Sequence, residues 1–217
     1  REVGSADLVG NIDRPTYNHD SLPRIAVFGA SNGRHQQKHT GMDDQDLIRR
    51  AQQGDASSFE ELLELHYDTI YRFAWKWCAS TADAEDIAQQ ACMKLANSLG
   101  QFRFESAFTS WLYRLVVTCA QDWGRSQQRH DHDVLSGDVL SHDDAQAEDE
   151  IYLRQLLAQL DDLGEGMRAT ALLVHAEGMS HARAGEILGV SESTISWRVH
   201  TIRKHMSKRE ARKSGVL

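Results

Sequence analysis

The chain of 217 residues carries 24 Lys and Arg against 32 Asp and Glu, a formal net charge of −8, and is long enough for one large or two small domains. With 41% hydrophobic residues, 7% aromatic residues and two prolines, the composition favours a helix-rich globular protein over a disordered chain or a β-sandwich. The negative charge argues at first against a nucleic-acid partner, because neutralising phosphates requires Lys and Arg.

The distribution of charge changes that first conclusion. Residues 131–150 contain eight acidic residues and no Lys or Arg, whereas residues 179–217 contain eight basic and three acidic residues. This profile predicts two folded units joined by a flexible acidic linker, with positive charge at the end of the second unit. The predicted segments are an irregular extension (1–41), a helical bundle (42–129), the linker (130–149), a second helical domain (150–206) and a basic tail (207–217).

The first 41 residues show neither a helical nor a strand period, so we expect irregular chain there. Within them, the segment Arg24–Gly33 resembles the glycine turn of a dinucleotide-binding unit. The residues that follow it form no apolar helix face, and no second strand with a ribose-binding acid comes after them. We therefore do not expect a nucleotide site.

The first unit opens with a short helix at residues 44–53, which Gly54 and Asp55 separate from a longer one. Apolar residues then recur every three or four positions up to Trp77, the pattern of an amphipathic helix. Ser80 and the acidic residues after it favour the start of another helix. The polar face of that helix is either solvated or a docking surface. The three cysteines fit no zinc motif and fall in apolar helical patterns, so we expect reduced core residues: Cys78, Cys92 and Cys119.

A loop at residues 100–107 precedes a third long helix, and in both segments aromatic and basic residues alternate. This arrangement suits stacking on unpaired bases beside contacts to phosphates. The same aromatic side chains also suit a hydrophobic core, and the sequence leaves the two interpretations open.

In the second unit, apolar periodicity predicts helices that start near Ile151 and Met167. Ser180 is expected to cap a shorter helix, and the tight turn at Gly189 and the following capping serine (Ser191 or Ser193) are typical of a helix-turn-helix. In the last helix Ile195, Val199 and Ile202 must face the core, which leaves a polar and basic face of the kind that a major groove accepts. A plain helical hairpin is the alternative.

Several motifs in the same chain and in the expected order closely resemble a bacterial RNA polymerase sigma factor of the extracytoplasmic-function (ECF) subgroup, over about residues 44–206. They are Leu47–Asp55, Phe59–Leu62, Tyr71–Ala74, Asp83–Gln89, Phe108–Arg114 and Gly178–Ser191. The resemblance implies an all-α, two-domain protein that is not an enzyme. Such a protein binds core RNA polymerase and directs promoter-specific transcription initiation.

The resemblance also assigns partners to residues. The second long helix would dock on the β′ clamp helices of the polymerase through Asp83, Glu85, Asp86, Gln89 and Gln90. The loop and third helix would recognise and open the downstream promoter element through Arg103, Phe104, Trp111, Arg114 and Arg125. The last helix would enter the major groove of the upstream element through Ser193, Ser196, Trp197, Arg198, His200, Arg203 and Lys204, and the second domain would also contact the β flap.

The resemblance adds an anti-sigma factor as a further partner. We expect no catalytic residue, metal or cofactor. No apolar run approaches the roughly 20 residues that span a bilayer, and no signal segment is evident. We therefore expect a cytoplasmic protein without membrane insertion.

The chain departs from the family pattern at a few positions. Val117-Thr118 stands where the family often has Arg-Asn, so contacts that separate the strands are expected to differ. Leu163-Gly164 replaces the usual Leu-Pro, and Ala184-Gly185 is expected to loosen the first helix of the helix-turn-helix. Trp197 stands where a small residue is common, which suggests an unusual upstream element.

Two other classes of function fit parts of the sequence. One is a helix-turn-helix transcriptional regulator that never joins the polymerase. The other is a metal hydrolase built in the linker from His130, His132, Asp133, His142 and Asp143, residue types that bind zinc. A flexible linker offers no preorganised geometry for such a site, which argues against it.

Overall fold

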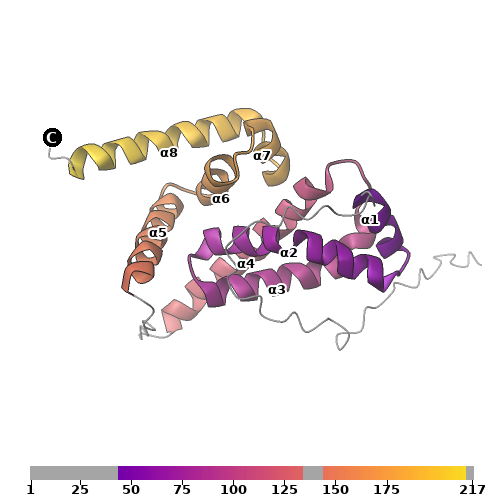
Figure 1. Ribbon diagram of the computed structural model, residues 1–217. Coiled ribbons are helices and arrows are strands. Elements are labelled where there is room, and N and C mark those ends of the chain that lie inside the picture. The colour runs from indigo at the N-terminus through magenta and orange to yellow at the C-terminus, as the bar shows by residue number, and fades with distance from the viewer. Residues whose placement is uncertain (1–43, 134–143, 214–217) are drawn as a thin grey trace, which may run out of the picture.

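The protein, a computed structural model, is described over residues 44–133 and 144–213, with side chains for residues 44–127 and 150–208. Every regular element within these ranges is helical (Figure 1), as the all-α prediction required. The first domain comprises α1 (Asp44–Gln52), α2 (Ala56–Cys78), α3 (Thr81–Ser98), the 3-10 turn η2 (Leu99–Gln101) and α4 (Phe108–Asp133). The second comprises α5 (Asp144–Asp162), α6 (Met167–Ala171), the π-helical turn η3 (Leu172–Ala176), α7 (His181–Leu188) and α8 (Glu192–Lys213).

Helices α2, α3 and α4 lie side by side, with α1 across one end of them (Figure 1). Asp55 starts α2 by accepting hydrogen bonds from the backbone N–H groups of Ser57 and Ser58, and Ser80 starts α3 in the same way through the N–H of Asp83. The apolar stripe predicted for α2 is buried throughout: Phe59, Leu62, Leu63, His66, Ile70, Phe73, Ala74 and Trp77. Helical periodicity therefore located this core correctly.

The helix-turn-helix is built as the sequence predicts. Ser180 caps α7, Gly189 closes it at a φ of 67°, and Ser191, the first of the two candidate serines, caps α8 through the N–H of Thr194. The buried residues of α8 are those expected from spacing: Ile195, Val199 and Ile202.

The expectation that Ala184-Gly185 loosens α7 is wrong. Ala184 is fully buried, and a Cβ atom on Gly185 would lie 2.8 Å from the carbonyl oxygen of Val190. The Val190 N–H also donates to the Gly185 carbonyl at 3.0 Å. Only glycine allows the backbone of the turn to approach α7 this closely, so Gly185 permits tight packing.

The helices extend beyond the segments in which apolar periodicity marks them. Helix α4 continues through Asp133 and α5 begins at Asp144, so helix occupies both ends of the segment predicted as linker. Helix α8 likewise runs on to Lys213, into the predicted basic tail. The sequence pattern therefore placed the ends of α4 and α8 too early and the start of α5 too late, because periodicity marks a helix only where apolar residues recur. The extension at residues 1–41 and its glycine turn lie outside the described residues.

The three cysteines are free and buried, which confirms them as reduced core residues. Burial raises the pKa of the Cys78 thiol to about 11 and that of the Cys92 thiol to about 12. Among the described residues, no group of three or more His, Cys, Asp and Glu is placed to hold a metal ion, and the side chains of the linker histidines lie outside the description. None of the described helices is both long enough and apolar enough to cross a membrane.

Candidate nucleic-acid interface

An aromatic cluster lies where the loop at residues 100–107 meets the start of α4. Phe102 is at its centre, with ring centroids 4.9 Å from Phe104 and 5.5 Å from both Phe108 and Trp111. Phe102 and Phe108 are buried, whereas Phe104 and Trp111 are half-buried at the edge of the cluster. Phe102 and Phe108 therefore belong to the core, whereas Phe104 and Trp111 keep part of their ring surface exposed.

Phe104 has an unusual backbone conformation. Its φ is 60°, in the left-handed region that costs a residue with a side chain about 1–2 kcal/mol. The Arg49 guanidinium of α1 lies over its ring, 5.1 Å from the centroid. Nearby, the side-chain amide of Gln52 donates hydrogen bonds to the carbonyl oxygens of Leu99 and Phe102, at 2.9 and 2.8 Å. Neither α1 residue was expected to contact this loop, because neither belongs to an apolar period that would place it there.

The three arginines predicted for the downstream element do not converge on one site. Arg103 is exposed in the loop, and Arg125 is exposed and ion-paired with Asp122. The guanidinium of Arg114 reaches the second domain instead: Nε donates to the carbonyl oxygen of Ile187 at 3.2 Å, and Nη2 to that of Glu186. These carbonyls lie in the last turn of α7, where a positive charge is favourable.

The polar face predicted on α3 lies opposite its buried side. Four of the five residues are exposed, and they stand above the buried Ala84, Ile87, Ala88 and Ala91: Glu85, Asp86, Gln89 and Gln90. Asp83 is half-buried and faces a cavity between the domains. Burial, with a smaller contribution from the negative charge of Glu85, raises the pKa values of Tyr67 and Tyr71 on α2.

The outer face of α8 presents most of the predicted upstream-element residues. Six of them are exposed: Ser193, Ser196, Trp197, His200, Arg203 and Lys204. Trp197 is 59% exposed, an unusual position for a large apolar ring, and Ser196 shares a hydrogen bond of 2.9 Å with Nδ1 of His181 on α7. Arg198 differs from the rest, since its guanidinium packs against Gly166 and lies 3.5 Å from the Thr170 hydroxyl, joining α8 to α6.

Arginines of the second domain bind the end of α2 just as Arg114 binds the end of α7. Arg154 donates to the carbonyl oxygen of Ala79, and Arg168 to that of Trp77, each at 3.0 Å. The last carbonyls of a helix have no partner within it, and a nearby guanidinium both satisfies them and complements the helix dipole. Each domain therefore caps a helix of the other.

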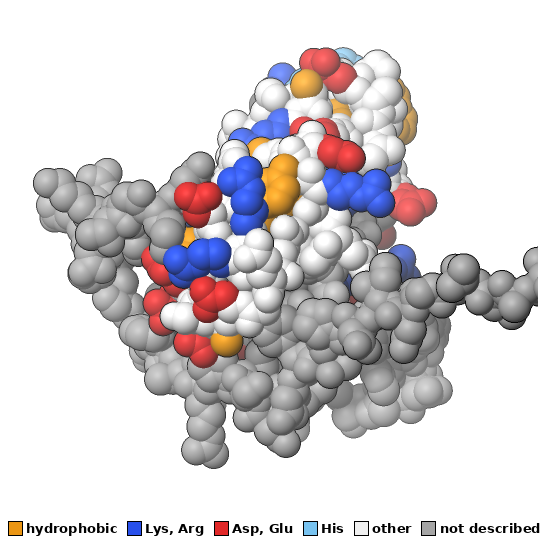
Figure 2. Space-filling view, turned by 90° about the vertical axis from the view of Figure 1, so that its right-hand side faces the viewer, with side chains coloured by type: hydrophobic (Ala, Val, Ile, Leu, Met, Phe, Trp, Pro, Cys, Tyr) orange, Lys and Arg blue, Asp and Glu red, His pale blue; other side chains and the backbone are white. Residues whose placement is uncertain are grey.

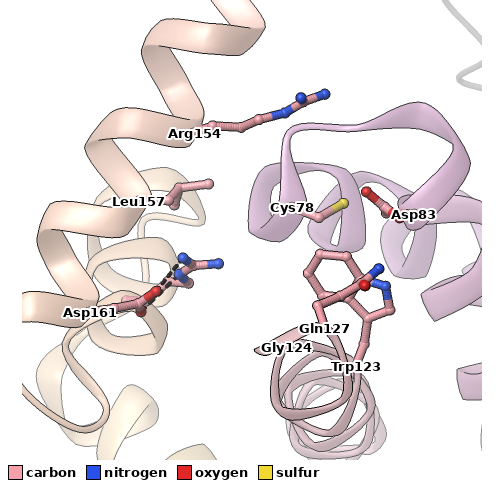
Figure 3. A pocket seen from close by; sticks show the side chains of 9 residues that line it. Cys78, Asp83, Trp123, Gly124, Gln127, Arg154, Leu157 and Asp161 are labelled. Atoms are coloured by element: carbon pink, nitrogen blue, oxygen red, sulfur yellow. Dashed lines mark hydrogen bonds and ion pairs between the residues drawn. The ribbon is translucent and has the colours of Figure 1, made fainter. Parts of the chain in front are cut away.

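A cavity of about 480 Å³ lies between the domains beside these arginines. Figure 3 shows Arg154, Leu157 and Asp161 of α5 on one side, Cys78 and Asp83 on the other, and α4 below them. Arg168, which also lines the cavity, is paired with Asp161. The mixture of charges and apolar groups favours no single class of ligand.

On the surface, acidic and basic side chains are mixed, and neither sign of charge covers the described part of the face in Figure 2. Figure 2 views the molecule from the side on which α1 lies, and on the described part of that face basic and acidic side chains are interspersed with small hydrophobic areas. Since salt screens charges beyond roughly 8–10 Å, such local groups govern contact with phosphates more than the net charge of −8 does.

Comparisons with known proteins agree with this arrangement. A family profile described as Sigma-70 region 2 matches residues 62–130. The ECF RNA polymerase sigma factor SigM of Mycobacterium tuberculosis is 30% identical over 178 residues, which cover 81% of this chain and 86% of SigM.

Two solved structures share the fold. CnrH, solved in complex with the cytosolic domain of CnrY, has a TM-score of 0.57 at 21% identity, covering 76% of this chain and 95% of that one. The sigma factor RpoE of Bartonella quintana, solved with the anti-sigma factor NepR, has a TM-score of 0.53 at 23% identity, covering 70% and 96%. The chain belongs to the ECF family of RNA polymerase sigma factors, which direct promoter-specific transcription initiation.

Proposed function

We propose that the first domain (42–129) binds core RNA polymerase through the polar face of α3, docked on the β′ clamp helices. The observation that carries this proposal is the exposure of Glu85, Asp86, Gln89 and Gln90 above a fully apolar buried side. An exposed polar face alone is compatible with ordinary solvation. Membership of the family makes docking the better explanation, because a sigma factor acts only when it is joined to the polymerase.

The loop at residues 100–107 and the start of α4 then recognise and open the downstream promoter element. Flipping a base out of the duplex costs a few kcal/mol, and stacking the flipped base on an aromatic ring is favourable by about 1–3 kcal/mol, which offsets much of that cost. Phe104 and Trp111 are the rings with surface available for this stacking, and Arg103 and Arg125 are exposed basic groups for phosphates. Arg114 becomes a third basic group available to phosphates when its hydrogen bonds to the carbonyl oxygens of α7 break.

The second domain (150–206) reads the upstream element by placing the outer face of α8 in the major groove, and it also contacts the β flap. Short polar side chains and His200 suit base edges, and Arg203 and Lys204 suit bases or phosphates. Arg198 acts from the α6 side of α8, where it orients the helix. The segment at residues 130–149 joins the two domains.

On this proposal the chain acts by binding and is not an enzyme, and it uses no cofactor or metal of its own. It acts in the cytoplasm, where core polymerase transcribes. An anti-sigma factor that holds the chain inactive is part of the same proposal.

The test is binding of the full chain to purified core RNA polymerase. The substitution Asp86→Lys reverses the charge at the centre of the α3 face and is expected to weaken binding at least tenfold, about 1.4 kcal/mol. Glu64→Lys makes the same change at an exposed position on α2 and serves as the matched control. Equal affinity of the two variants would refute docking through α3.

A further inference from the structure

We infer that Gln52 and Arg49 of α1 are positioning residues for the base-capture loop (residues 99–104), which they hold in its binding conformation before DNA arrives. The inference rests on the proposed function, because the role of this loop in DNA binding belongs to that proposal. It extends the downstream-element site to a helix to which no DNA role has been assigned.

Gln52 fixes the backbone of the loop. Its two hydrogen bonds join the carbonyl oxygens of Leu99 and Phe102, which lie 47 and 50 residues further along the chain. The Phe102 N–H closes the turn between them by donating to the Leu99 carbonyl at 3.0 Å. A primary amide has two N–H donors, so one side chain ties both ends of the turn that leads into Phe104.

Arg49 and Phe102 both contact the ring of Phe104. The guanidinium of Arg49 lies 5.1 Å and the ring of Phe102 lies 4.9 Å from the Phe104 ring centroid. Arg49 is itself held by Asp46 and Gln45, at 3.2 and 3.3 Å. A residue with a side chain keeps a φ of 60° only where its surroundings hold it, and such conformations cluster at functional sites.

The anchoring of α1 does not require these polar contacts. Leu47, Ile48 and Ala51 are at most 3% exposed, and they pack the helix onto the core. The hydrogen bonds of Gln52 and the charge of Arg49 are directed at the loop. If the loop were not already ordered, its ordering would reduce the favourable free energy of DNA binding. Preordering therefore favours capture of the base without strengthening the attachment of the domain to the polymerase.

The test compares Gln52→Met, which keeps the length of the side chain and removes both donors, with Gln53→Met at the exposed neighbouring position. In the free full chain, amide hydrogen exchange at residues 99–104 should become about tenfold faster in the Gln52 variant only, as expected for one or two lost hydrogen bonds. The thermal midpoint should fall by only a few degrees relative to the control, the global counterpart of that tenfold change.

The second readout uses holoenzyme, formed from core polymerase and the full chain, on promoter DNA that the wild type selects by run-off transcription. Permanganate reactivity of unpaired thymines should fall about tenfold in the Gln52→Met holoenzyme, while its affinity for core polymerase stays at the wild-type value. Gln52→Lys restores N–H donors and should recover opening, and Gln53→Lys controls for the added charge.

Unchanged exchange in Gln52→Met, or equal changes in the Gln53 control, would overturn the inference. A combined loss of thermal midpoint and polymerase affinity would also overturn it, since that result shows a purely structural role. If wild-type holoenzyme opens no DNA, the proposed function fails, and the exchange measurement still decides whether Gln52 orders the loop.

Discussion

The carboxylate of Glu177 lies 2.6 Å from the Nζ atom of Lys76, a residue 101 positions earlier in the chain. Its second oxygen accepts a hydrogen bond from the Tyr113 hydroxyl at 2.7 Å. Burial together with the bond to Glu177 raises the pKa of Tyr113 well above its ordinary value, so the phenol remains a donor. One carboxylate on the turn before α7 therefore holds both α2 and α4 of the first domain.

Replacing Glu177 with alanine should weaken the contact between the domains. Lys76 and Tyr113 lose their shared acceptor in a partly buried setting, which is expected to lower the free energy of unfolding by about 1–3 kcal/mol. Small-angle scattering should show a larger radius of gyration. The control is Glu165→Ala, at an exposed position between α5 and α6. Identical scattering and unfolding curves for the two variants would show that Glu177 does not join the domains.

Substituting Gly185 with alanine should disrupt the helix-turn-helix. The added Cβ would lie 2.8 Å from a backbone oxygen in the turn, which cannot move aside as a flexible side chain can. We expect a loss of about 1–3 kcal/mol in the free energy of unfolding, measured by urea denaturation.

The control for this prediction is Gly124→Ala in α4, where nothing lies within 4 Å of the added atom. A glycine within a helix is less favourable than alanine by about 0.5–1 kcal/mol, so this variant should be slightly stabilised. Equal stability changes in the two variants would contradict the close approach at Gly185.

The sequence predicted those features that repeat or that depend on neighbouring residues. The buried faces of α2, α3 and α8 follow from spacing, and the caps at Ser80 and Ser180 follow from residues one turn away. Such features are set locally, because a side chain and the helix that it caps or packs are specified by the same few residues.

Contacts between distant polar groups could not be predicted in this way. The bonds from Arg114 to α7 and from Gln52 to the loop join residues 73 and 47 positions apart, and no period marks them. Gly185 is a further case, because a departure from the family pattern suggested looseness where the structure shows close packing. The residues assigned to polymerase and DNA remain predictions that binding measurements must test.

His66 should make the stability of the first domain depend on pH. Its side chain is 11% exposed, packs edge-on against Phe108, and lies 3.6 Å from the Asp44 carboxylate. Burial lowers the pKa of His66 below the model-peptide value of 6.5, and the opposing effect of Asp44 is smaller. As the pH falls below about 6.5, the unfolded chain takes up a proton that the folded chain resists, so stability is lost towards acid pH.

The measurement is the thermal midpoint between pH 7.5 and 5.5. His66→Leu should show a shallower decline than the wild type, because it removes this proton uptake, and His200→Gln on the exposed face of α8 should decline as the wild type does. A decline in His66→Leu as steep as that of the wild type would assign the pH dependence to other groups, of which His175, with a pKa also lowered by burial, is the first to examine.

Arg203→Ala should separate base recognition from phosphate binding on α8. Arg203 is exposed on α8, six residues beyond Trp197, and a bidentate contact to a guanine is worth about 1–3 kcal/mol of discrimination. We expect holoenzyme carrying Arg203→Ala to lose that much affinity for the selected upstream element while its affinity for unrelated duplex changes little. Lys208→Ala, at an exposed position five residues further along α8, should instead weaken binding to both duplexes alike and reduce the slope of affinity against salt by about one unit. If both variants weaken binding to both duplexes equally, Arg203 contacts phosphate, and the base-reading part of α8 lies between Ser193 and His200.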